Sequence, residues 1–135
     1  MPYMFKGALN YYSAYMASKL SFVDLFNDLE KYIDHPRRRW KCVVRVKRGI
    51  ADTGEPGGLY KDQVYLEGAI QILRERQAID FIALYCGKLS LDDLKRPMIE
   101  KRLKKEGGLI FPTFMQTMEE YNKSLEIIAK TNFIT

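Results

Sequence analysis

The stretch DTGEPGGLYKDQVYLEG, residues 52–68, joins a loop rich in glycine and proline to the start of a helix. Glycine and proline interrupt regular structure, so residues 51–58 are expected to form a loop and a helix is expected to begin at about Lys61. On such a helix Lys61 and Tyr65 share one face at a spacing of i, i+4, and Gly68 falls near the same stripe. A glycine there leaves room for a backbone or a ligand to approach. The stretch is therefore interpreted as part of a binding site.

Apolar residues recur at helical spacing on both sides of this loop, which predicts an all-α fold. Strand signals are nearly absent, so the expected architecture is an irregular bundle of about six to seven helices in a single domain, residues 1–135, with the loop at 51–58. Helical signals, two of them short, occur at residues 5–20, 21–33, 36–48, 61–76, 80–85, 90–95, 98–105 and from 113 to about 128. Capping signals mark three starts: Ser21, Ser90 and Thr113.

The composition limits the class of protein. Of the 135 residues, 47% are hydrophobic and 13% are aromatic, which supports one modest core and argues against disorder. The net charge of +5 permits an acidic partner without requiring one. Two cysteines, Cys42 and Cys86, are too few and too distant for a disulfide framework, which favours a cytoplasmic location. The sequence contains no apolar run of about 18 residues that would span a membrane.

Complete catalytic or metal-binding motifs are absent from the sequence. His35 is the only histidine and precedes a proline in an expected surface loop, so a zinc helix cannot be built and triad chemistry is disfavoured. No phosphate-binding loop of the GxxxxGK[ST] or GxGxxG type occurs. The chain by itself is therefore expected to hold no metal and no cofactor.

The helix expected at residues 36–48 is strongly basic. Trp40 and its valine neighbours are expected on the buried stripe of this helix. The basic side is either a solvated face or a place where Arg45, Lys47 or Arg48 holds a carboxylate, for which the guanidinium fork is suited. Nucleic-acid binding would need aromatic stacking platforms on that same side and is disfavoured. Four basic residues follow this side at i, i+4, i+8 and i+11: Arg37, Lys41, Arg45 and Arg48.

Two interpretations of Lys61 and Tyr65 stay open. In the first, Lys61 is exposed in a first helical turn and Tyr65 is half-buried, with no ligand involved. In the second, Gly57 and Gly58 bring the loop close to a ligand that Lys61 and the Tyr65 hydroxyl contact. A tyrosine hydroxyl beside a metal-polarised carbonyl would stabilise an oxyanion.

Several segments resemble one known family in their order and spacing: YYSAY at 11–15, LSFVDLF at 20–26, RVKRG at 45–49, the block from Gly57 to Gly68, and YCGKLSLDDL at 85–94. They are similar to the C-terminal part of the flavohemoglobin-expression-modulating QEGLP-motif proteins, a family that includes the microtubule-associated tyrosine carboxypeptidases. The resemblance covers almost the whole chain. Its most specific element is the Gly-Gly-x-x-Lys-Asp-x-x-Tyr-Leu block.

The resemblance implies the C-terminal part of a larger zinc metallopeptidase fold. In the family, a His-Glu-x-x-His motif and a further glutamate hold the zinc, and both lie upstream of the matched region. This chain lacks those motifs, so the resemblance transfers no metal ligand and no catalytic glutamate to it. The resemblance implies a substrate-side position for five residues, Arg45, Lys47, Arg48, Lys61 and Tyr65, with Tyr65 as the oxyanion stabiliser. The loop glycines Gly57 and Gly58 are added to this set.

Three functional hypotheses follow. The first is the substrate-side portion of a tyrosine carboxypeptidase-like zinc metallopeptidase, truncated or split, which binds a peptide or protein C-terminus. It is inactive alone, because no zinc-bound water forms without ligands. The second is a non-enzymatic helical module that binds an acidic protein or an anion, and the third, weaker, is nucleic-acid binding. Faces meant for the missing part would expose apolar surface, which predicts self-association through the first, second or last helix.

Overall fold

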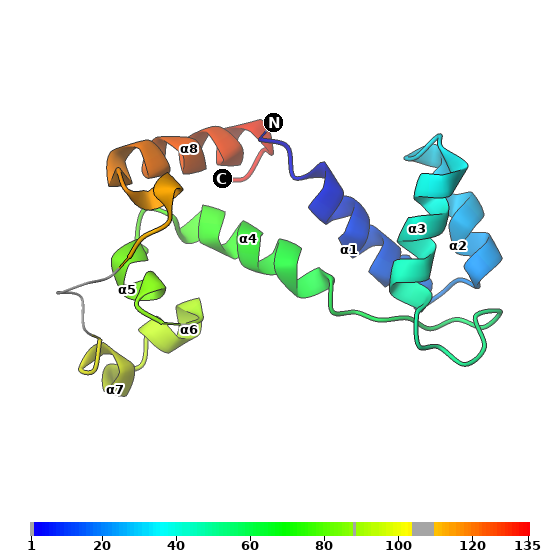
Figure 1. Cartoon of the computed structure of the whole chain (residues 1–135), viewed down its shortest axis with the longest axis horizontal. Helices are drawn as coiled ribbons and strands as arrows, with labels where there is room; N and C mark the ends of the chain where they lie inside the picture. Colours follow the sequence, from blue (N-terminus) through cyan, green and yellow to red (C-terminus); the bar gives the residue numbers. More distant parts are fainter. Residues whose placement is uncertain (1, 88, 104–109) are drawn as a thin grey trace. The chain divides into compact units, whose positions relative to one another are not determined.

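The structure, a computed structural model, describes residues 2–87, 89–103 and 110–135. All regular structure in these residues is helical, which confirms the predicted all-α class (Figure 1). The α-helices are α1 (Phe5–Ala17), α2 (Phe22–Asp28), α3 (Pro36–Lys47), α4 (Gln63–Glu75), α5 (Phe81–Tyr85), α6 (Leu91–Leu94), α7 (Pro97–Glu100) and α8 (Met118–Thr131). Two 3-10 turns, η1 (Leu29–Lys31) and η2 (Thr113–Met115), complete the set.

The described residues divide into two compact units, each of which is described by itself. The N-terminal unit is residues 3–69, and the C-terminal unit is Pro2 together with residues 70–135. Helix α4 begins in the first unit and ends in the second. The expectation of a single domain over residues 1–135 stays a prediction.

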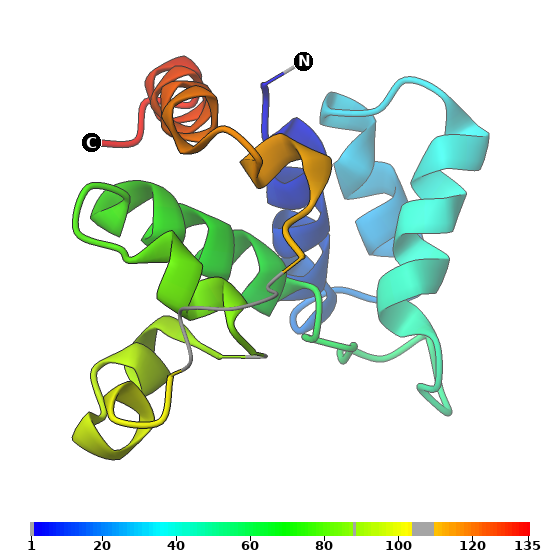
Figure 2. The ribbon, with the colours of Figure 1, turned by 60° about the vertical axis from the view of Figure 1, so that its left-hand side comes forward.

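The core of the N-terminal unit lies where α1, α2 and α3 run side by side (Figures 1 and 2). Helices α1 and α3 each contribute two buried apolar residues at a spacing of three, and α2 with the following turn η1 contributes two at a spacing of four, as the helical period requires. Alanines on α1 let the neighbouring helices approach closely, and each buried Leu or Val side chain contributes about 1.5–3 kcal/mol. The core residues are Ala14, Ala17, Leu25, Leu29, Val43 and Val46.

Local capping explains where two of these helices begin. The Ser21 hydroxyl accepts a hydrogen bond from the backbone N–H of Asp24 at 3.1 Å, which confirms the predicted start of α2. The His35 ring accepts one from the N–H of Arg37 at 3.2 Å and precedes Pro36 at the first position of α3. The one histidine of the chain therefore has a capping task.

The loop at residues 51–58 is irregular, as predicted, and it is fastened to the ends of α1 and α3. The Gly57 N–H donates to the carbonyl oxygen of Ala17 at 2.7 Å, and the Leu59 N–H donates to that of Val46 at 2.7 Å. The last carbonyls of a helix have no partner within it, so these bonds satisfy groups that would otherwise be left open. The loop is thereby part of the folded unit.

The C-terminal unit is built from the end of α4 and the helices that follow. The Phe81 ring meets the Tyr121 ring edge-on at a centroid distance of 5.1 Å. Arg76 at the end of α4 pairs with Glu126 of α8, Nε to Oε1 at 2.7 Å. Helix α6 begins with the predicted capping box between Ser90 and Asp93. These contacts connect α4, α5 and α8.

Two helix boundaries in this unit differ from the sequence prediction. The last helix does not begin at Thr113: residues 113–115 form the turn η2, Thr117 is extended with φ of −113°, and α8 starts at Met118. Burial of Met115 holds the turn in place. Helix α7 ends at Glu100, and the remainder of the predicted 98–105 helix lies partly outside the described residues.

Two glycine substitutions test how closely the loop packs. A Cβ at Gly58 would lie 2.7 Å from the Ala17 Cβ and 3.0 Å from the Val46 carbonyl oxygen, whereas one at Gly68 would meet nothing within 4 Å. Gly58→Ala is therefore expected to lower the free energy of unfolding by about 1–3 kcal/mol. Gly68→Ala, the control within helix α4, should raise it by about 0.5–1 kcal/mol. Urea denaturation measures both, and equal effects would contradict the packing of this loop.

Candidate functional site

A buried carboxylate, Asp62, lies at the centre of the candidate site. It sits just before α4 with 6% of its surface exposed. Arg45 of α3 binds it with two hydrogen bonds, from Nε and from a terminal guanidinium nitrogen, the second at 2.9 Å. This fork-shaped pairing with Arg45 holds the pKa of the Asp62 carboxyl below its usual range. No local sequence signal marks Asp62 as a site residue, because its partner is 17 residues away.

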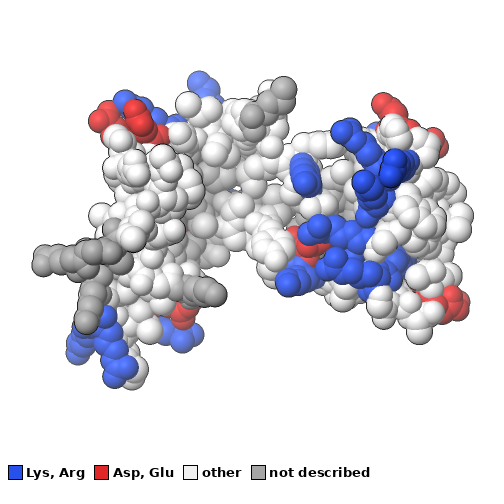
Figure 3. Space-filling model, in the orientation of Figure 1, with Lys and Arg blue, Asp and Glu red and all other residues white. Residues whose placement is uncertain are grey.

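Further predicted site residues gather around this pair. Arg48 and Lys61 both lie close enough to Asp62 to contribute to its lowered pKa, and Tyr65 interacts electrostatically with Arg45. Three cations around one carboxylate leave an excess of positive charge. Figure 3 shows that Lys and Arg atoms gather on the visible face of the N-terminal unit. We call this set the Asp62 cluster: Arg45, Arg48, Lys61, Asp62 and Tyr65.

Lys61 and Tyr65 are placed differently from the sequence expectation. Helix α4 begins at Gln63, so Lys61 lies in the turn before it and does not share a helical face with Tyr65. Tyr65 is 60% exposed, where the non-functional interpretation expected it to be half-buried. Both side chains are therefore on the surface beside Asp62, although the helix is not what brings them there.

Lys47 faces the interior instead of the surface. Only 2% of it is exposed, and its ammonium donates to the carbonyl oxygens of Leu20 at 2.6 Å, Glu55 at 2.8 Å and Ala17 at 3.4 Å. An ammonium has three donors, and all three are used here. Burial lowers the pKa of Lys47. In this structure Lys47 holds the loop to α1 and has no donor left for a substrate.

The loop glycines serve the backbone path in this structure. Gly57 has φ of +141°, a conformation that a side chain would strain, and its N–H is bonded to α1. Gly58 lies where a Cβ would collide with Ala17. The space beside Gly58 is thus filled by α1. Contact of Gly57 and Gly58 with a substrate stays a prediction.

The buried stripe predicted for α3 is wrong at Trp40 and Val44. Trp40 is 55% exposed, its ring packs at a tilt against Phe22 at a centroid distance of 4.8 Å, and Val44 is also exposed. Arg39 and Lys47 are buried in their place, next to Val43 and Val46. Both cations have partners. Those of Lys47 are the carbonyl oxygens named above, and Arg39 lies 2.6 Å from a carboxylate oxygen of Glu30 and over the ring of Phe26. The side of α3 on which an aromatic is exposed is therefore also the basic side.

The described residues hold neither a metal-ligand group nor a membrane-spanning helix. Across residues 2–87, 89–103 and 110–135, no three His, Cys, Asp or Glu side chains are grouped so as to hold a metal ion. The thiol of Cys42 is half-buried, and this burial raises its pKa. In the same ranges no helix has the length and apolar character needed to cross a membrane.

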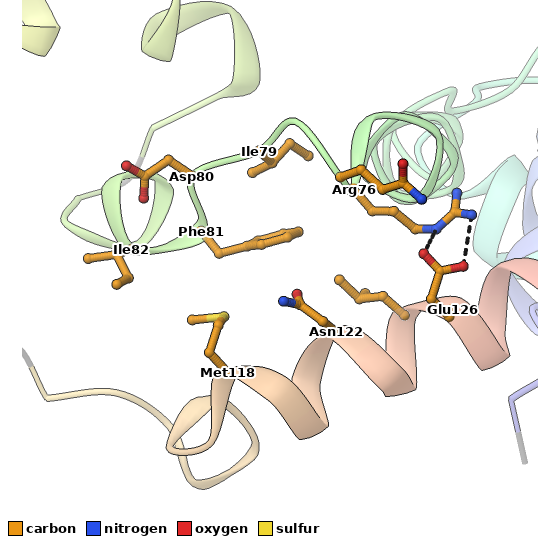
Figure 4. A pocket seen from close by; sticks show the side chains of 10 residues that line it. Arg76, Ile79, Asp80, Phe81, Ile82, Met118, Asn122 and Glu126 are labelled. Carbon is orange, nitrogen blue, oxygen red and sulfur yellow. Dashed lines mark hydrogen bonds and ion pairs between the residues drawn. The ribbon is translucent and has the colours of Figure 1, made fainter.

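A pocket of about 410 Å³ opens in the C-terminal unit between the end of α4, α5 and α8 (Figure 4). Its floor includes Phe81 and Met118, and Asn122 points toward it. The ion pair of Arg76 and Glu126 forms one rim of the pocket. Its second contact, from Arg76 Nη2 to Glu126 Oε2, measures 3.0 Å. Arg76 lowers the pKa of the Glu126 carboxyl. None of the predicted site residues lines this pocket.

Comparison with known proteins gives a consistent result. The sequence model of a family described as microtubule-associated tyrosine carboxypeptidase matches residues 13–135. MATCAP2 from Mus musculus, whose full name includes the words tyrosine carboxypeptidase, is 43% identical over 135 residues, which cover 99% of this chain and 25% of that protein. Microtubule-associated tyrosine carboxypeptidase 1 from Homo sapiens is 43% identical, over 97% of this chain and 27% of its own length. The chain spans about a quarter of the length of these curated relatives.

Neutralising Asp62 tests the centre of the cluster. Asp62→Asn is expected to lower the free energy of unfolding at pH 7 by about 1–3 kcal/mol, because Arg45 then faces a neutral amide. The pKa of Asp62 is depressed in the folded chain. Its stabilising effect is therefore complete above the ordinary carboxyl value of 3.8 and is lost as the pH falls through the folded-state value.

The difference between wild type and Asp62→Asn should therefore shrink below about pH 4. Urea unfolding at pH 7, 5 and 3 measures it. Glu67→Gln, which neutralises an exposed carboxylate of α4, is the control and should change stability at pH 7 by less than about 0.5 kcal/mol. A difference for Asp62→Asn that is the same at all three pH values would be inconsistent with the ion pair.

Proposed function

This chain belongs to the microtubule-associated tyrosine carboxypeptidase family, and from that premise we propose that it is the substrate-side portion of a carboxypeptidase-like fold. In this proposal the Asp62 cluster receives the carboxylate of a peptide or protein C-terminus. One observation carries it. Residues from two separate segments, 45–48 and 61–65, meet at a single buried carboxylate and leave an excess of positive charge on the surface.

The roles within the cluster follow from its pairings. Asp62 engages Arg45 through both carboxylate oxygens and so fixes the end of α3 against the segment before α4. Within the described residues neither Arg48 nor Lys61 has an ion pair, so their donors are available to an incoming carboxylate. A hydrogen bond to a charged group is worth about 1.5–3 kcal/mol. The exposed Tyr65 hydroxyl would donate to the oxygen of the scissile carbonyl.

Zinc is implied for complete members of the family, and the described residues of this chain do not fit it. They contain no group of three ligands, so no step through a metal is assigned to this chain. The chain alone is expected to bind a C-terminus without cleaving it. The small number of cysteines, Cys42 and Cys86, supports the proposal of a cytoplasmic location.

A non-enzymatic helical module that binds an acidic protein or an anion remains the second candidate. The exposed basic side of α3 favours it, and binding without cleavage by any longer form would distinguish it from the first. Self-association is also proposed, because apolar side chains are exposed on the first, second and last helices: Phe5, Val23 and Ile127.

Recognition of a free C-terminus can be measured on the chain itself. A hexapeptide ending in tyrosine with a free carboxylate should bind at least about tenfold more tightly than the same peptide with an amidated end, a difference of about 1.4 kcal/mol. Arg48→Gln and Lys61→Gln should each remove most of that difference, whereas Lys123→Gln on α8 should not. Amide shifts in an NMR titration give both affinities. Equal binding of the two peptides would contradict the proposal.

The catalytic part of the proposal is tested together with the region that the relatives have outside the matched quarter. A chimera in which this chain replaces the matched quarter of the mouse MATCAP2 protein should release tyrosine from the peptide, while the 135-residue chain alone releases none. In that chimera Tyr65→Phe should lower kcat about tenfold or more with little effect on KM, since its hydroxyl acts on the scissile carbonyl. Unchanged kcat would reduce Tyr65 to a scaffold residue.

A further inference from the structure

The first half of α1 carries an apolar stripe that the rest of the N-terminal unit covers only in part. Its members recur at i, i+3, i+4 and i+7 and so share one face of the helix: Phe5, Ala8, Leu9 and Tyr12. Leu9 and Tyr12 pack against the core, whereas Phe5 is 57% exposed. Together with Tyr32, which directly follows η1, these residues line a pocket of about 270 Å³. The pocket is therefore rich in aromatic rings and open to a ligand.

A cation already lies against two of these rings. The planes of the Tyr12 and Tyr32 rings are 79° apart, and their centroids are 5.1 Å apart. The ammonium of Lys31 lies over both rings, 5.1 Å from the Tyr12 centroid and 5.2 Å from the Tyr32 centroid. The face of an aromatic ring is electronegative and attracts a cation. This corner between α1 and η1 is thus electrostatically suited to positive charge.

Asp28 adds a formal negative charge beside the rings. One of its carboxylate oxygens accepts a hydrogen bond from the Tyr12 hydroxyl at 2.7 Å, and the other accepts one from the Lys31 ammonium at 2.7 Å. Each oxygen therefore already has a donor, and the five side chains that line the pocket are aromatic or aliphatic. An incoming ammonium with three N–H donors would lose its water without gaining equivalent partners.

We propose that this pocket binds a quaternary ammonium group, carried by a trimethylated lysine side chain of a partner polypeptide. A trimethylammonium keeps its positive charge, so the rings and Asp28 attract it, and it has no N–H donor to satisfy. Its methyl groups match the apolar lining. We call this site the Tyr12–Tyr32 pocket: Phe5, Ala8, Leu9, Tyr12 and Tyr32. None of these residues belongs to the Asp62 cluster, so the proposal does not rest on the peptidase role.

Lys31 is the internal competitor of such a ligand. Its side chain is 47% exposed, and its ion pair with Asp28 joins residues three apart on the surface. An exposed ion pair of this kind contributes little net stability, because water screens it and two mobile side chains must be ordered. A ligand that binds the rings better than a primary ammonium can therefore displace Lys31.

Two other occupants fit less well. A phosphocholine headgroup carries the same trimethylammonium, but it also brings a phosphate close to the carboxylate of Asp28, and like charges in contact are unfavourable. A second copy of this chain would cover the apolar stripe. In a symmetric pair it would also bring the ammonium of Lys31 toward its own counterpart.

The probe is trimethyllysine that is acetylated at its amino end and amidated at its carboxyl end, so that it offers no terminal carboxylate to the Asp62 cluster. Two matched probes are the same compound with an unmethylated side chain, and the neutral analogue in which a tert-butyl group replaces the trimethylammonium. An NMR titration that follows the ring signals of Tyr12 and Tyr32 gives the affinities. The trimethylated probe should bind at least about threefold more tightly than either matched probe.

Variants relate the binding to the two rings and to the competitor. Tyr32→Leu keeps an apolar side chain but removes a ring, and should weaken binding of the trimethylated probe at least about threefold, whereas Tyr32→Phe should leave it within about twofold. Lys31→Met removes the competing ammonium and should tighten binding at least about twofold. Lys19→Met is the matched control and should have no effect: it removes the same charge from the Tyr15 ring, whose centroid lies 4.2 Å from the Lys19 ammonium.

Several results would overturn the proposal. Absence of binding would do so, and so would equal binding of the trimethylated and tert-butyl probes, which would show an apolar pocket without recognition of a cation. Equal effects of Lys31→Met and Lys19→Met would show a response to net charge alone. Tighter binding of phosphocholine than of the trimethylated probe would show a headgroup site, and an affinity that falls as the protein concentration rises would show that a second copy covers the pocket.

Discussion

The N-terminal unit depends on the hydrogen bonds that the buried ammonium of Lys47 donates to backbone carbonyl oxygens. This ammonium is a buried charge, which is expensive to remove from water, and its three hydrogen bonds to carbonyl oxygens are what make the burial tolerable. Those carbonyls belong to the end of α1, the residues after it, and the loop at 51–58. One side chain near the end of α3 thus connects the residues at and just after the end of α1 with the loop at 51–58.

The surface chemistry follows from this interior connection. With the loop fastened to α1, the chain leaves Gly58 against Ala17 and turns into α4 beside the end of α3, where Asp62 meets Arg45. The two interactions act at different depths: Lys47 binds backbone carbonyls in the interior, and the Arg45–Asp62 ion pair closes the same junction near the surface. The cations that neither interaction uses, Arg48 and Lys61 among them, give this junction its excess positive charge, which is the basis for the proposed binding of a C-terminal carboxylate.

Short-range signals in the sequence predicted most of the fold, and long-range partners explain where prediction failed. The all-α class and the start of α2 at Ser21 follow from spacing and capping, which act over a few residues. The helical period gives α3 one buried stripe but does not say which side it is on. Arg39 pairs with Glu30 and lies on the buried side of α3, whereas Trp40 lies on the exposed side. Asp62 was missed for the same reason: its importance lies in an arginine of another helix.

Hydrogen exchange at two loop amides tests the central claim most directly. The N–H groups of Gly57 and Leu59 are bonded to the carbonyls of Ala17 and Val46, and the account makes those bonds dependent on Lys47. In Lys47→Met, both amides should exchange at least about tenfold faster, while amides in α8 keep their protection and the exposed control Lys41→Met changes neither. Unchanged protection of Gly57 and Leu59 in Lys47→Met would contradict the account.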